Sequence, residues 1–231
     1  MRCGQADDAW MLGVRAMAEA GMTSGPIELP FVLGTAPNAD VMTINLPGGT
    51  FVGASTVAMF TYRPTGSSYA VTGGIGLGLQ RMTAQTTTPV TVDATLRNAV
   101  FDLMQHRTLA TVLTEVRQGI GTAGWHVMAG IRADLPIGDA TAILWQRELN
   151  AAVLPYQLAQ AAVRHRSYLP SAWRLSGSLG LGRDFMVGMH GNTGMYCTPF
   201  VAVAAGKVLD ATGGWMPLCV QIGVTVSKRI R

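Results

Sequence analysis

The stretch Tyr69–Met82 reads YAVTGGIGLGLQRM, and a second stretch, Trp173–Met186, reads WRLSGSLGLGRDFM. Each starts with an aromatic residue and continues with small residues that alternate with apolar ones. A shorter version, WHVMAGIRADL, occupies Trp125–Leu135. Because successive side chains of a β-strand point to opposite faces, alternation with a period of two predicts strands. Residues 50–62 and the turn Arg63–Gly66 precede the first stretch, so we expect a hairpin there.

Glycine on alternate positions leaves one face of these strands almost bare. A bare face lets a neighbouring layer approach closely, whether that layer belongs to the same chain or to another copy. Although Gly74–Gly78 contains a G-x-G, no helix is expected to begin there, so a phosphate-binding loop is not predicted. The candidate packing or interface residues are Gly74, Gly76, Gly78, Gly180, Gly182 and Trp10.

The composition points to a surface that is covered. Apolar residues make up 48% of the 231 residues, yet charged residues make up only 13%, about half of the usual share. A free monomer in water normally carries more surface charge. The cover could be sister subunits or lipid.

Three helices are expected in addition to the strands. Asp7 and Asp8 favour a helix N-terminus, and Trp10, Val14 and Met17 follow at helical spacing. Two longer helices are expected over about 93–118 and 140–164. The predicted fold is therefore α+β, mainly antiparallel β-sheet of sandwich or barrel type, in a single domain. Its parts are an N-terminal helical arm (about 6–21), a β-rich part (25–82), a helical middle (93–165) and a C-terminal β part (168–229).

The residues with reactive side chains do not form a recognisable site. None of the four histidines (His106, His126, His165 and His190) is spaced with other ligands for a metal. Ser55 lacks the flanking glycines of a nucleophile elbow, and Cys197 near His190 lies in an apolar context that does not favour a thiolate. We therefore expect no cofactor, no metal and no enzymatic activity. Cys197 and Cys219 are expected to be reduced, with a disulfide between them as the alternative.

The net charge of +4 comes partly from two short basic clusters. They are expected to lie on a solvated face, with contact to nucleic acid or to an acidic neighbour as the alternative. The candidate basic contact residues are Arg164, Arg166, Lys228, Arg229 and Arg231.

Two functions compete. The favoured one is a structural subunit of a large homo-oligomeric assembly, such as a viral or phage capsid, tail or connector protein in a virion assembled in the host cytoplasm. Its partners would be copies of itself and other subunits, without a membrane. The alternative is an outer-membrane-type β-barrel, favoured by aromatic-led alternating strands. Three features count against it: the two long expected helices, the lack of a secretory signal pattern in MRCGQADDAW, and a final segment, Lys-Arg-Ile-Arg, that does not end in an aromatic residue. A small hydrolase-like enzyme is a further alternative.

Overall fold

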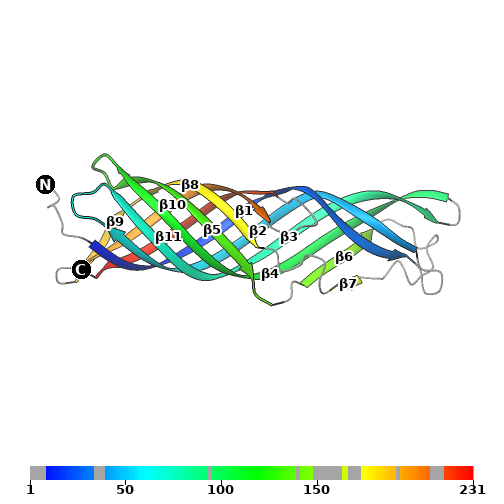
Figure 1. Ribbon diagram of the computed structural model, residues 1–231, viewed down its shortest axis with the longest axis horizontal. Coiled ribbons are helices and arrows are strands. Elements are labelled where there is room, and N and C mark those ends of the chain that lie inside the picture. The colour runs from blue at the N-terminus through cyan, green and yellow to red at the C-terminus, as the bar shows by residue number, and fades with distance from the viewer. Residues whose placement is uncertain are drawn as a thin grey trace.

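The computed structural model is a closed barrel of antiparallel β-strands (Figure 1). It describes residues 9–33, 40–92, 95–138, 141–147, 163–165, 173–190, 193–208 and 216–230. Within these ranges there is no helix. The strands are β1 (Ala9–Leu33), β2 (Asp40–Arg63), β3 (Tyr69–Val92), β4 (Thr95–Ile120), β5 (Trp125–Pro136), β6 (Thr141–Arg147), β7 (Val163–His165), β8 (Arg174–Arg183), β9 (Phe185–His190), β10 (Thr193–Val208) and β11 (Met216–Arg229).

Eight of the described strands close the barrel, each pairing with its neighbour in the order β1-β2-β3-β4-β5-β8-β10-β11. The last strand returns to the first, with Val226 opposite Val14, so the barrel has no open edge around its middle. Closure matters because an open edge would leave backbone N–H and C=O groups without partners. The remaining strands extend the wall: β6 pairs with β4, β7 pairs with β6, and β9 pairs with β10.

Short turns join the strands at the end of the barrel where both chain termini lie, called the terminal end below (Figure 1). The expected turn after Arg63 is confirmed: the Ser67 amide donates to the Pro64 carbonyl at 3.1 Å. Gly66 has φ 69°, a backbone conformation that glycine adopts without steric cost. Gly121 and Gly124, with φ 62° and 78°, serve the β4–β5 turn in the same way.

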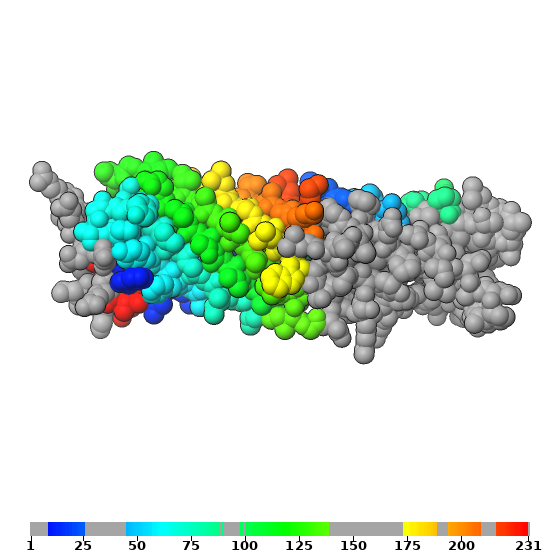
Figure 2. All heavy atoms as spheres, viewed as in Figure 1, coloured from blue at the N-terminus to red at the C-terminus, as the bar shows by residue number. Residues whose placement is uncertain are grey.

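At the opposite end, called the far end, two hairpins rise beyond the closed part (Figure 1). The β2–β3 ladder stops at the pair Gly49 and Ala84, while β2 continues beside β1 and β3 continues beside β4. Gly25, with φ 107°, lies in the bulge that separates Ser24 from Ile27 in the β1–β2 ladder. The space-filling view shows the elongated outline that results (Figure 2).

A β-bulge interrupts the pairing of β9 with β10 at Val187, shortly after β8 ends. On β10, Tyr196 pairs with Met186 but the adjacent Met195 pairs with Gly188, so Val187 is skipped. Such a bulge leaves one residue without a partner and bends the strand. The alternation of inward and outward side chains ends at this point, and Phe185, Met186 and Val187 are all exposed.

The strand alternation is inverted relative to a water-soluble protein. On β11, Gln221 and Thr225 are buried inside the barrel, whereas the apolar Val220, Ile222 and Val224 are exposed on the outside. Apolar side chains do fill part of the interior, in two clusters: Met17, Met128, Phe200 and Ala202, and Val57, Met59 and Leu113. The interior is therefore mixed, and the outer wall is mainly apolar.

The α+β prediction is wrong, because the segments expected to be helical are strands. The N-terminal arm is the start of β1, and the expected helix over 93–118 is β4. Trp10 and Val14 face outward while Met17 faces inward, so the helical spacing does not mark one face. The third expected helix begins as the strand β6, and most of its remaining residues lie outside the described ones.

Candidate functional site in the barrel lumen

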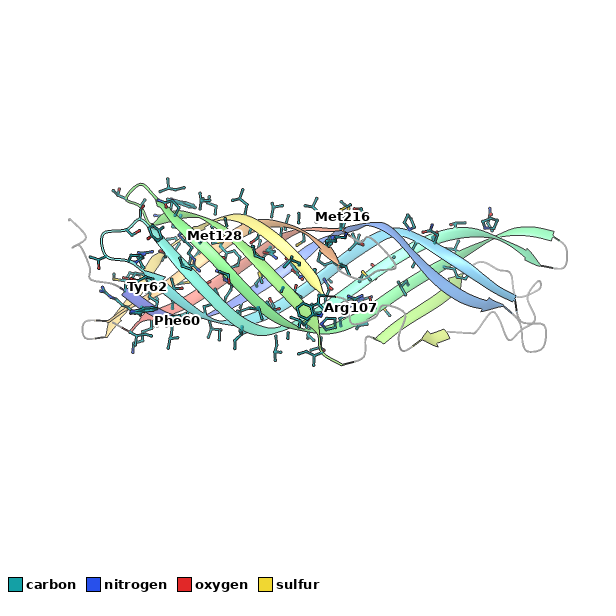
Figure 3. All side chains as sticks on the ribbon, in the orientation of Figure 1. Phe60, Tyr62, Arg107, Met128 and Met216 are labelled. Atoms are coloured by element: carbon teal, nitrogen blue, oxygen red, sulfur yellow. The ribbon has the colours of Figure 1, made fainter. Side chains whose placement is uncertain are left out.

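The outer wall carries an apolar band around the barrel (Figure 3). On β11 the outward residues from Met216 to Val226 are all apolar, and Lys228 follows on the same face. Ten steps of about 3.4 Å, at a typical tilt of about 40°, span roughly 26 Å along the barrel axis. Exposed members of the band include Leu12, Val14, Val71, Ile75, Leu77, Leu79, Val112, Val116, Ile131, Leu175, Leu179, Leu181, Val201, Val203, Leu218, Val220, Ile222, Val224 and Val226.

Aromatic side chains gather on the outer wall near the terminal end. Trp10 stacks on Phe60 with ring centroids 4.9 Å apart and contacts Tyr62 at 4.3 Å, and Figure 3 places Phe60 and Tyr62 at that end. Arg183 lies over the rings of Trp125 and Phe185. Rings with an apolar body and a polar edge, beside a cation, suit the boundary between an apolar medium and water.

Inside the barrel, charged residues from the four strands β1, β4, β5 and β8 meet in a compact group, called the lumen cluster. Its part nearer the terminal end is built on Glu115 of β4. The Glu115 carboxylate accepts two hydrogen bonds from Arg15 at 2.9 and 3.0 Å and one from Arg117 at 2.7 Å. Arg15 also donates to Thr225 at 3.0 Å and lies over the ring of Phe200, 4.6 Å from its centroid. These contacts tie β1 to β4 across the lumen.

The part nearer the far end has two carboxylates and two guanidiniums. Arg132 donates to Asp134 at 2.7 Å and to Glu19 at 3.1 Å. Arg174 donates to the same two carboxylates, at 2.7 Å to Asp134 and 2.9 Å to Glu19. Thr111 donates a further hydrogen bond to Asp134 at 2.7 Å. Since every one of these residues is buried, the pairing offsets a desolvation cost of several kcal/mol per ion.

The lumen cluster blocks the middle of the barrel. On its terminal side lies a cavity of about 250 Å³, the vestibule, which is lined by Arg63, Arg117, Asp184 and Arg229 among others. On its far side the cavity that touches Asp134 and Arg174 is only about 20 Å³. A continuous water-filled path is therefore interrupted at the ion pairs.

The candidate packing glycines line the lumen side of the wall. A Cβ at Gly76 would overlap the Thr56 carbonyl, and one at Gly180 would lie 2.6 Å from the Ala202 Cβ. The layer that approaches their bare face is therefore a neighbouring strand of the same chain. Similar contacts meet a Cβ at Gly74 (2.7 Å from Met59 Sδ), at Gly78 (3.1 Å from Ser55 Cβ) and at Gly182 (2.6 Å from His126 Nε2).

The other candidate residues are spread over the molecule. Lys228 and Arg229 lie at the terminal end of β11, and Arg229 lines the vestibule. Arg164 belongs to β7, whose side chains are outside the described ones, as are Arg166 and Arg231. The structure does not bring the two basic clusters together within the described residues.

The reactive residues are equally scattered. Cys197 and Cys219 are free thiols, so the alternative of a disulfide between them is wrong. His126 and Ser55 are buried facing the lumen, and His106 is exposed on the outer wall. The side chains of His165 and His190 lie outside the described ones. No group of three or more metal-ligating side chains occurs in the part of the chain that is described.

Sequence reasoning did not identify the lumen cluster, although its residues have a recognisable pattern. Each of its charges stands next to apolar or small residues, as in Val14-Arg15-Ala16, Ala18-Glu19-Ala20 and Trp173-Arg174-Leu175. Isolated charges between apolar neighbours indicate a strand with a polar inner face and an apolar outer face. The seven residues of the cluster are Arg15, Glu19, Glu115, Arg117, Arg132, Asp134 and Arg174.

No family model and no curated protein matches the chain. Among solved structures, the chain is similar to the outer membrane protein OprG from Pseudomonas aeruginosa, with 14% identity, 96% of this chain and 98% of that chain covered, and a TM-score of 0.37. It is also similar to the beta domain of the Bordetella autotransporter BrkA, with 10% identity, coverage of 94% and 98%, and a TM-score of 0.27.

The expectation of a viral or phage shell protein is wrong. The chain is a closed barrel that buries charged residues inside and exposes apolar residues around its outer wall. This apolar outer wall also contradicts the expected set of partners, which left out a membrane. The helices that counted against a barrel are strands. The described residues also contain no helix long and apolar enough to cross a membrane.

Proposed function

We propose that this chain is an integral outer-membrane β-barrel protein whose lumen is closed by ion pairs. The observation that carries the proposal is the inverted polarity of the wall: charged residues are buried inside, and an apolar band of roughly 26 Å covers the outside. That height is close to the apolar band of about 25 Å that membrane barrels carry. A closed ladder also satisfies the backbone where lipid offers no hydrogen bonds.

The low charge content supports the same proposal. An outer wall in contact with hydrocarbon needs no charged side chains, so charges concentrate in the lumen and at the two ends. Lys228 and Arg183 face outward near the terminal end, and Arg81 and His106 do so towards the far end. The low charge content thus supports lipid, rather than sister subunits, as the cover of the outer wall.

A first experiment tests the membrane assignment. The purified chain is expected to need detergent or vesicles for folding, and the folded form is expected to migrate differently from the heated form on a denaturing gel. A stable, monodisperse protein in buffer without detergent would overturn the assignment.

A second experiment tests closure of the lumen. In a planar bilayer the folded protein is expected to show no steady ohmic current, because Glu19, Asp134 and their arginine partners occupy the passage. A general porin serves as the positive control. A steady current would refute closure while leaving membrane insertion intact.

The proposed role is that of a membrane-embedded binding or structural barrel, without enzymatic activity. The residues considered for nucleophilic chemistry support this. Cys197 lies on the outward side of β10, and Ser55 is buried among the inward residues of β2. Esterase substrates with several acyl chain lengths should give no turnover above the background of empty vesicles, and measurable turnover would contradict the proposal.

A further inference from the structure

The small cavity on the far side of the lumen cluster has an unusual lining. Two guanidinium groups face it, those of Arg107 from β4 and Arg174 from β8, and Figure 3 marks Arg107 in the middle of the molecule. Phe51 and Leu109 supply apolar walls, and Gln80 supplies an amide. The cavity is therefore a polar space in a largely apolar setting.

Both arginines present N–H groups that lack partners among the described residues. Arg174 uses Nε and Nη2 for Asp134 and Glu19, but its buried Nη1 has no hydrogen-bond partner in the described ranges. The buried Nε of Arg107 has none there either. Arg174 is only 6% exposed, so bulk water does not reach its free N–H. Buried donors without partners are costly, and each one in a native structure requires an explanation.

The charge balance identifies the kind of ligand. The described residues that face the closed part of the lumen include the arginines at 15, 107, 117, 132 and 174, but only three carboxylates, Glu19, Glu115 and Asp134. Two positive charges are therefore in excess. Arg107 and Arg174 line the same small cavity, so their like charges repel each other. An anion between them would remove that repulsion and accept both free N–H groups.

The size of the space limits the anion. A cavity of about 20 Å³ exceeds the 10–15 Å³ that a single water requires, and it leaves no room for a phosphate or an organic acid. Asp134 also lines the cavity, but Thr111, Arg132 and Arg174 already donate to its carboxylate. We propose that the cavity is a halide site, which holds chloride in ordinary salt between Arg107 Nε and Arg174 Nη1.

Bromide provides the direct test. Crystals of the folded barrel in detergent, grown or soaked in sodium bromide in place of sodium chloride, are expected to show an anomalous scattering peak between the two guanidinium groups. The peak should disappear in Arg107→Met and persist in Arg81→Met. Arg81 is the matched control, because it lies at a similar height on β3 but points outward. A cavity that holds only water, without an anomalous peak in the wild type, would overturn the proposal.

Thermal unfolding separates an anion site from a purely structural arginine. At constant ionic strength, replacing gluconate by chloride is expected to raise the melting temperature of the wild type and of Arg81→Met more than that of Arg107→Met. The reason is that a ligand bound only by the folded state stabilises that state by an amount that grows with the logarithm of the ligand concentration above its Kd. Equal shifts in all three proteins would refute a chloride site. The test depends on the barrel fold and not on where the barrel resides.

Discussion

The C-terminal segment of the barrel offers a stringent test of membrane embedding, through two isoleucines at different depths. Ile222 and Ile230 belong to the same C-terminal segment and are 58% and 51% exposed. Ile222 lies near the centre of the apolar band on β11, whereas Ile230 lies beyond Lys228 at the terminal end. Eight steps of about 3.4 Å at a tilt of about 40° separate them by roughly 21 Å along the barrel axis.

The perturbation is Ile→Arg at each position. An arginine at the midplane of a bilayer costs a membrane barrel about 2–4 kcal/mol, and near the interface it costs about 0–1 kcal/mol. We therefore expect Ile222→Arg to lower the free energy of unfolding by about 2–3 kcal/mol more than Ile230→Arg. This difference corresponds to a roughly 30- to 140-fold change in the ratio of folded to unfolded protein.

The assay is a denaturant titration of the barrel in large unilamellar vesicles, followed by tryptophan fluorescence and checked for reversibility. Because the two variants change the same residue type to the same residue on the same face, composition and net charge are matched. Equal, small losses at the two positions would refute the embedding of this wall in hydrocarbon.

Three further predictions concern the interior and the thiols. Glu19→Gln should destabilise the barrel by about 3–5 kcal/mol in the same titration, because Arg132 and Arg174 would then share the single carboxylate of Asp134. The double variant Glu19→Met/Arg132→Met should recover part of this loss, because it leaves one arginine, Arg174, paired with one carboxylate, Asp134. Gly76→Leu should lower the free energy of unfolding by roughly 1–3 kcal/mol or more through overpacking. Gly73→Leu is the control and should be tolerated, because a Cβ there meets nothing within 4 Å. Similar losses of stability at both positions would contradict close packing at Gly76. Cys219, which is 5% exposed and faces inward, should react with a maleimide only after unfolding, and fast labelling of the folded protein would contradict its position.

The strands that repeat the opening pattern could be predicted from the sequence, because small and apolar residues alternate there without interruption. β3, β5 and β8 coincide with these stretches. The turn at Gly66 could be predicted for a similar reason, since Pro64 and Gly66 restrict the backbone to turn conformations. The alternation of residue types along the chain was enough to predict a strand wherever each face of the strand carried one kind of side chain.

The long strands β1 and β4 were mistaken for helices because both of their faces contain apolar residues. On β4, Leu109 and Leu113 face inward while Val112 and Val116 face outward, and together these four residues imitate a helical stripe. On β1, alanines are frequent, and alanine favours helices in isolation. Closure of the barrel overrides that preference, because in the closed part each strand pairs with two neighbours, which satisfies its backbone groups there.

The lumen cluster could not be predicted from the sequence because its partners are far apart in the chain. Arg15 and Glu115 are separated by 100 residues, and Glu19 and Arg174 by 155. Only the register of the strands around the barrel brings them to the same height. An isolated charge on one strand is compatible with water, with a sister subunit or with a lumen, and the sequence alone does not distinguish these environments.

The skipped residue at Val187 has a consequence for how the sequence can change in evolution. In a wall with lipid on one side and ion pairs on the other, gaining or losing one residue within a strand exchanges the two faces from that point onward. Changes of odd length are therefore expected to be selected against inside the paired segments. They can accumulate only where the alternation is already interrupted, as at the bulge around Val187 in β9. Related sequences should therefore vary in length at their turns and at this bulge, while the number of residues in the paired segments between them stays constant.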